Sequence, residues 1–148
     1  MKTMARERDT AELLQRLRQI RPESGRQWGK MTAHQMVCHL TESLKMALGE
    51  LPVTPKNLPL RYPPLKQLII FVAPFPKNAP TAPELVITAT PNEWARDVST
   101  LTALMDRFAA RGQAGPWTDH PAFGRLSPRA WGVLVYRHMD HHLRQFGG

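Results

Sequence analysis

The chain has 148 residues, a net charge of +8 and a single cysteine, Cys38, which excludes an intrachain disulfide framework and a multi-cysteine zinc site. Hydrophobic residues make up 42%, a globular composition, so we expect one domain over residues 1–148. No apolar run reaches the roughly 20 residues that cross a bilayer, and residues 1–9 lack the apolar core of a secretory signal, which predicts a cytoplasmic protein with no membrane partner.

The first helix is predicted over residues 10–20, where apolar side chains recur at helical spacing. Asp9 is expected to cap its N-terminus, with Glu12 three residues further on, and Pro22 to end the segment. The residues that form its apolar stripe are Leu13, Leu14, Leu17 and Ile20.

The second helix is predicted over residues 33–48, and a capping box signals its start. The Thr32 hydroxyl can accept a hydrogen bond from the amide of Gln35, whose side chain can reach back to the amide of Thr32. Gly49 is the expected stop, because glycine adopts the left-handed conformation without a steric penalty. The apolar stripe of this helix is Met36, Leu40, Leu44 and Leu48.

A proline-rich middle segment follows, with nine of the fourteen prolines between residues 51 and 83. This density excludes a long helix and predicts an ordered crossing connection. Within and after it, residues 65–73 are expected to form a short helix and residues 85–88 an extended stretch too small to build a sheet. The side chains of the segment that should need burial are Leu60, Tyr62, Phe71 and Phe75.

The third long helix is predicted over residues 91–110, with Thr90 as N-cap, Pro91 and Glu93 in the first turn, and Gly112 as the stop. Its apolar stripe is Trp94, Val98, Leu101, Met105 and Phe108.

The last helix is predicted over residues 128–146, with Ser127 as N-cap and Pro128 at the first helical position. Four long amphipathic helices, with one long proline-rich crossover between the second and the third, predict an all-α protein. The expected architecture is an antiparallel four-helix bundle.

One face of the last helix turns from apolar side chains to imidazoles. A buried neutral imidazole needs partners at its nitrogens, because an unsatisfied polar group costs ~1–3 kcal/mol. Two histidines one turn apart can instead bind the same metal ion. The residues on this face, at spacings of four, three and four, are Trp131, Val135, His138 and His142.

A third ligand is expected from a facing helix, and His39, at the edge of the apolar stripe of the second helix, is the best candidate. Three neutral imidazoles hold a divalent ion and leave positions open for water or substrate, as catalytic sites do. Imidazole ligands suit zinc, nickel, iron and copper, and we favour Zn or Ni with Fe as a further candidate.

The other histidines have different predicted roles. His34 lies in the first turn of its helix on a different face and is expected to be exposed. His141 could replace His142 as the partner of Gln145 or be exposed, and its spacing of three from His138 also allows it as a ligand. His120, before a proline in a loop, is interpreted as a turn or packing residue that could also line a pocket.

Three further residues near the histidines are Cys38, Glu42 and Asp140. Cys38 is interpreted as a small buried apolar residue. Glu42 and Asp140 either orient the imidazoles or are solvated carboxylates.

If no metal binds, the chain is a helical binding or interaction protein with hydrogen-bonded histidines. The scattered basic residues favour a solvated surface over a nucleic-acid partner.

Three stretches of the chain, residues 28–40, 120–132 and 138–147, resemble the DinB/YfiT-like superfamily, and more narrowly a bacterial branch of unknown function. The resemblance covers most of the chain, although the proline-rich middle is longer than in a plain member. It implies a four-helix bundle, a homodimer and a divalent metal on three histidines. The residues that match this histidine pattern are His39, His138 and His142.

The resemblance also implies an activity. Some superfamily members are S-transferases or isomerases that use a low-molecular-weight thiol, so the expected partner is a small-molecule substrate such as a thiol. A metal ion favours the thiolate at neutral pH, and the thiolate is the nucleophile. The same open site could instead activate water for hydrolysis.

Overall fold

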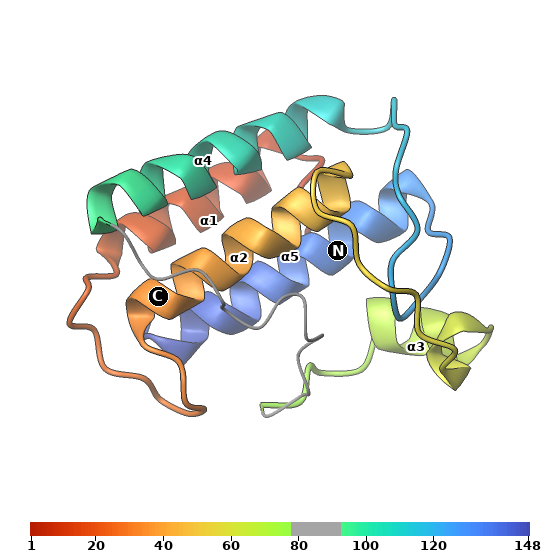
Figure 1. The fold of residues 1–148 in the computed structure, drawn as a ribbon, viewed down its shortest axis with the longest axis horizontal. Helices are drawn as coiled ribbons and strands as arrows, with labels where there is room; N and C mark the ends of the chain where they lie inside the picture. The colour runs from red at the N-terminus through yellow and green to blue at the C-terminus, as the bar shows by residue number, and fades with distance from the viewer. Residues whose placement is uncertain (78–92) are drawn as a thin grey trace.

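The computed structural model describes residues 1–77 and 93–148, and within these ranges the protein is all-helical, with five α-helices, one 3-10 helix and no strand (Figure 1). The all-α prediction is therefore confirmed for the described residues. The elements are α1 (Glu7–Gln19), α2 (Ala33–Leu48), the 3-10 helix η1 (Pro59–Arg61), α3 (Leu65–Phe71), α4 (Trp94–Arg111) and α5 (Pro128–Gln145).

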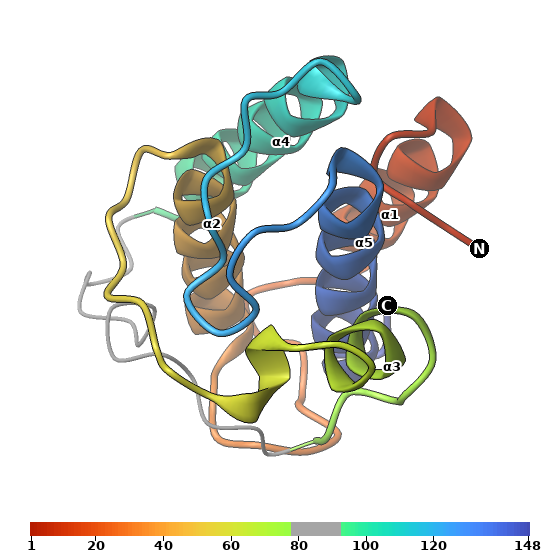
Figure 2. The ribbon, with the colours of Figure 1, turned by 90° about the vertical axis from the view of Figure 1, so that its right-hand side faces the viewer.

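The four long helices surround one apolar core, and each of them packs against two others (Figure 2). Helix α2 contacts α4 and α5, and α1 contacts the same two helices from the other side. The short α3 lies outside this group, against α5 and η1. The largest fully buried side chains include Trp131, Phe108, Leu13, Leu17, Met36, Leu40, Leu44, Leu101, Met105 and Met139.

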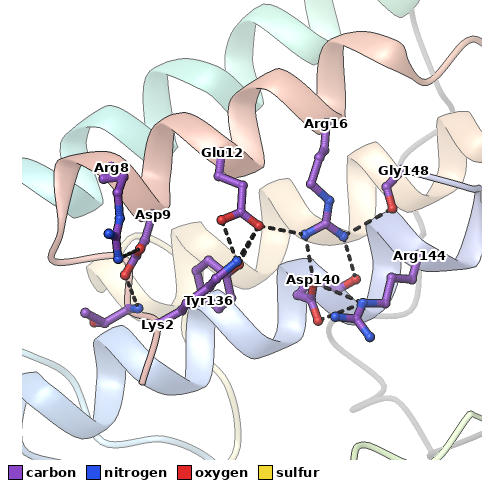
Figure 3. A network of polar contacts seen from close by, with 10 residues as sticks. Lys2, Arg8, Asp9, Glu12, Arg16, Tyr136, Asp140, Arg144 and Gly148 are labelled. Atoms are coloured by element: carbon purple, nitrogen blue, oxygen red, sulfur yellow. Dashed lines mark hydrogen bonds and ion pairs between the residues drawn. The ribbon is translucent and has the colours of Figure 1, made fainter.

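A row of polar contacts joins α1 to α5 along the outside of the core (Figure 3). Arg16 donates to Oδ1 of Asp140 at 2.7 Å and to the carbonyl of Gly148 at 3.2 Å. One turn earlier, Glu12 accepts from the hydroxyl of Tyr136 at 3.1 Å. These contacts place α5 in a defined rotation about its axis, and so help to set which of its faces is turned toward α2.

The capping signals of α2 and α5 are confirmed. Thr32 Oγ1 accepts from the amide of Gln35 at 3.1 Å, and the Gln35 side chain accepts from the amide of Thr32 at 2.9 Å. Gly49 ends α2 at a left-handed φ of 82°. Ser127 caps α5 by accepting from the amide of Ala130 at 3.2 Å. The predicted short helix at residues 65–73 is α3.

The predicted start of α1 is wrong, because the helix begins at Glu7 and Asp9 lies inside its first turn. The reason is tertiary. Asp9 is fully buried and its carboxylate accepts from the amide of Thr3 at 3.0 Å. The amide of Met4 in turn donates to the carbonyl of Gly132 on α5 at 3.0 Å. Asp9 therefore anchors the N-terminal segment to the helix and does not cap it.

The structure also corrects two predictions around the proline-rich segment. Helix α4 begins at Trp94, after an extended Glu93, so Glu93 is the N-cap and not a residue of the first turn. Tyr62 is 61% exposed and not buried, because it follows η1 on the outer side of the fold. The expected cap at residues 90–91 and the extended stretch at residues 85–88 lie outside the described residues.

Among the described residues, no helix is both long and apolar enough to cross a membrane.

Candidate metal centre

Three imidazoles from two helices meet between α2 and α5. Nε2 of His138 lies 3.2 Å from Nε2 of His39 and 3.1 Å from Nε2 of His142. The three candidate ligand atoms all lie within 4.8 Å of one another. His138 and His142 are one turn apart on α5 and share a face, and α2 packs against that face. The structure therefore brings together the three histidines that the sequence singled out.

The protonation of His142 is set by its neighbour Gln145. The side-chain nitrogen of Gln145 donates to the carbonyl oxygen of Trp28 at 2.8 Å, which fixes the orientation of the amide. Its oxygen, Oε1, then faces Nδ1 of His142 at 3.0 Å. Because an amide oxygen can only accept, Nδ1 carries the proton and the lone pair of His142 Nε2 points at the other two rings.

A glycine allows this contact. Gly29 has a left-handed φ of 78°, and a Cβ built on it would lie 2.5 Å from the side-chain nitrogen of Gln145. Any other residue there would have to displace the amide that orients His142. Gln145 was predicted as the partner of a histidine, and its spacing of three from His142 places it on the same side of the helix.

Burial keeps the imidazoles of His138 and His142 neutral. His39 is 3% exposed and His142 is 8% exposed. Burial, together with the nearby ring of His39, lowers the pKa of His142 to about 3. Burial also lowers the pKa of His138 well below its ordinary value, with His142 and His39 acting in the same direction. At neutral pH both rings of α5 therefore keep one free lone pair each.

The distances from Nε2 of His138 to the other two Nε2 atoms are those of ligands around one ion. Two nitrogens at 2.0–2.1 Å from a tetrahedral zinc ion are separated by about 3.3 Å, close to the separations of 3.1 and 3.2 Å at His138. In a metal-free site, the contact between His142 and His138 is a hydrogen bond only if His138 carries its proton on Nε2. Nε2 of His138 would then have to donate that same proton to Nε2 of His39 as well as to Nε2 of His142.

Aromatic and basic side chains lie beside the three histidines. The ring of Phe75 lies 6.4 Å from that of His138 and 6.1 Å from that of His141. Trp28 packs 5.5 Å from the ring of His141, and Lys77 Nζ lies 4.8 Å from the centre of the Trp28 ring. The indole nitrogen of Trp28 is buried without a hydrogen-bond partner in the part of the chain that the structure describes.

The contacts of His141 and His120 show where these two histidines lie relative to the cluster of three. His141 lies outside the cluster of three and contacts the ring of His142 at 5.2 Å. His120 closes a turn, as predicted, because its Nδ1 accepts from the amides of Ala122 and Phe123 at 3.1 and 3.2 Å. The pKa of His120 is lowered to about 4 by burial.

Two carboxylates that were considered as partners of the imidazoles are instead paired with cations. Glu42 accepts from Lys45 at 2.9 Å, and Asp140 accepts from Arg16 at 2.7 Å. The prediction that His34 is exposed is wrong. Its side chain is 18% exposed, and its Nε2 lies 2.6 Å from Oδ2 of Asp97, a residue of α4.

The comparisons with known proteins identify one family. A family model for a protein of unknown function, DUF1569, matches residues 4–147, nearly the whole chain. No curated protein and no solved structure matches the chain.

Proposed function

This chain belongs to the DUF1569 family, whose function is unknown, and we propose that it is a metal-dependent enzyme whose divalent ion is held by His39, His138 and His142. The observation that carries the proposal is the convergence of three Nε2 atoms, with separations at His138 that fit one ion. Neutral imidazoles also suit Zn or Ni, and Fe as a further candidate.

Each residue of the site has a distinct role toward a bound ion. A bound ion would supply a Lewis acid that lowers the pKa of a thiol or a water molecule. His142, oriented by Gln145, directs its lone pair to the ion, while His39 ties α2 to the same point. Three protein ligands leave at least one position for the small-molecule substrate. The ring of Phe75 lies beside that of His138, with the ring centres 6.4 Å apart.

The proposal extends to the superfamily and to the substrate. The ring of four long helices around one core supports a DinB/YfiT-like four-helix bundle, and the three-histidine pattern supports the same assignment. We propose a low-molecular-weight thiol as the substrate, transferred or isomerised at sulfur, with hydrolysis by activated water as the second reaction. We also propose a homodimer, on the resemblance alone.

Metal analysis of protein purified without a histidine tag tests the ligand set. The wild-type chain is expected to hold one more equivalent of divalent metal than the chain with His39, His138 and His142 all changed to Ala. His141→Ala is the matched control, a histidine of the same helix outside the cluster, and it should keep the metal. Equal metal content in the wild type and the triple variant would contradict the proposal.

Cobalt spectroscopy separates the two reactions. In a Cys38→Ser background the protein has no thiol of its own. Addition of a small thiol to the cobalt-loaded protein should then produce sulfur-to-cobalt charge-transfer absorption if the ion takes a thiol substrate. If this absorption does not appear at saturating thiol, the thiol reaction is wrong and hydrolysis remains.

A further inference from the structure

A second group of metal-ligating side chains lies on α2, on the flank that faces α4. His34 and Cys38 are one helical turn apart, and Asp97 comes from α4. Oδ2 of Asp97 lies 2.6 Å from Nε2 of His34 and 3.9 Å from Sγ of Cys38. The three candidate ligand atoms lie within 4.8 Å of one another.

This group is separate from the three histidines. Cys38 and His39 are neighbours in the chain, and successive side chains of a helix point about 100° apart. His39 therefore faces α5, where it meets His138, while Cys38 faces α4, where it meets Asp97. Helix α2 packs against both α4 and α5, so each flank of the helix has its own partners.

The surroundings hold the group in place and leave it accessible. The edge of the His34 ring packs on Trp94 at 5.5 Å with an interplanar angle of 81°, and Trp94 begins α4. The side chains of His34 and Asp97 are 18% and 20% exposed. An ion from solvent can reach ligands that are partly open and already converge on one carboxylate oxygen.

Hydrogen bonding within the protein explains well why His34 lies against Asp97, but it explains only weakly why Cys38 does. A thiol is a weak hydrogen-bond donor, and at 3.9 Å it adds little to a partly exposed carboxylate. One nitrogen, one sulfur and one oxygen ligand form a donor set that zinc accepts.

We propose that His34, Cys38 and Asp97 form a second divalent-metal site, selective for zinc-like ions that accept a thiolate. On binding, a bond forms from the ion to Sγ of Cys38 and the thiol proton leaves to solvent, with no change of oxidation state. His34 Nε2 and Asp97 Oδ2 supply the other two ligands. Their separation must widen from 2.6 Å to about 3.3 Å, which rotation of two partly exposed side chains provides.

Cobalt absorption tests the site, because sulfur gives a charge-transfer band that imidazole ligands do not. The test uses the full chain with His39, His138 and His142 changed to Ala, so that cobalt at the first site does not contribute. We expect one equivalent of cobalt to produce sulfur-to-cobalt absorption in the near ultraviolet, and Cys38→Ser, His34→Ala or Asp97→Asn to abolish or reduce it. Asp106→Asn, an exposed carboxylate of the same helix, is the matched control and should leave it unchanged.

A second measurement on the wild-type chain does not depend on the folding of any variant. Cys38 is the only cysteine, so its alkylation rate reports on this site alone. We expect zinc, added in excess over both candidate sites, to slow the alkylation on the order of tenfold, because coordination occupies the sulfur that attacks the reagent. An alkylation rate unaffected by zinc, or cobalt-loaded protein without a sulfur band, would overturn the proposal. Neither result would affect the three-histidine site, which contains no sulfur.

Discussion

The side chain of Gln145 connects His142 to the backbone of Trp28, 117 residues away from Gln145 in the chain. A group that fixes the tautomer and the orientation of a ligand affects the metal without touching it. Gln145→Leu removes the acceptor for Nδ1 of His142 and is expected to lower the affinity for the ion by roughly 10–100-fold. Competition with a chromophoric chelator measures this change.

Two other variants control the experiment on Gln145. Gln145→Glu keeps an acceptor opposite Nδ1 and should retain most of the affinity. Gln67→Leu changes an exposed glutamine of α3, far from the histidines in the sequence, and should have no effect. If Gln145→Leu binds the ion as tightly as the wild type, Gln145 does not orient His142 in the way that we infer.

His120 provides a test through the pH dependence of stability. Burial lowers its pKa from the ordinary 6.5 to about 4. Between these values the unfolded chain binds a proton at His120 that the folded chain does not, so the free energy of unfolding falls as the pH falls from about 6.5 to about 4. His120→Asn retains an acceptor for the amides of Ala122 and Phe123 but does not titrate.

Urea unfolding of the two proteins at pH 7.5 and at pH 4.5 measures the effect of His120. We expect the wild type to lose more stability than His120→Asn over this interval, because the other buried histidines contribute to both proteins alike. Equal losses in the two proteins would show that His120 takes up its proton in the folded state as readily as in the unfolded chain.

The residues of the candidate site could be predicted where the signal was local. The spacing of His138 and His142 on one helix, and the position of His39 at the edge of the apolar stripe of another, are visible in the sequence. The role of Gln145 depends on the carbonyl of Trp28, and the position of His34 depends on Asp97 of a different helix. Contacts of this kind follow from packing and leave no local pattern.

Helix boundaries show the same division between local and tertiary causes. Helix α2 begins after Thr32 and ends before Gly49, as predicted, because both signals are satisfied within the helix itself. Helix α1 begins earlier than predicted, because Asp9 turns inward to hold the amide of Thr3. The end of the proline-rich crossover could not be predicted from caps alone, since α4 begins at Trp94.

The capping box of α2 is expected to stabilise the element that carries His39. Thr32→Ala removes the acceptor for the Gln35 amide and should lower the free energy of unfolding by about 1 kcal/mol. Thr100→Ala is the control, because Thr100 is an exposed residue in the interior of α4 whose hydroxyl bonds to the carbonyl of Arg96. It should change stability by less than about 0.5 kcal/mol. Equal effects of the two changes in urea unfolding would contradict the role of the cap.

For the whole molecule, an ion at the three histidines would join α2 to α5 across 99 residues of sequence. An ion that binds only the folded chain stabilises it by about 2.7 kcal/mol when its free concentration is 100 times the Kd. We expect urea unfolding in a Cys38→Ser background to show this gain on metal addition and to lose it with a chelator. His141→Ala should keep the gain, and the triple histidine variant should not show it. A gain of equal size in the triple variant would assign the stabilisation to another site.

Anomalous diffraction from a crystal grown with zinc locates the ion that we propose. We expect a peak at the zinc edge within about 2.0–2.1 Å of Nε2 of His39, His138 and His142, with Oε1 of Gln145 still facing Nδ1 of His142. A zinc-loaded crystal without a peak between these rings, or with the three rings turned away from one another, would contradict the three-histidine site.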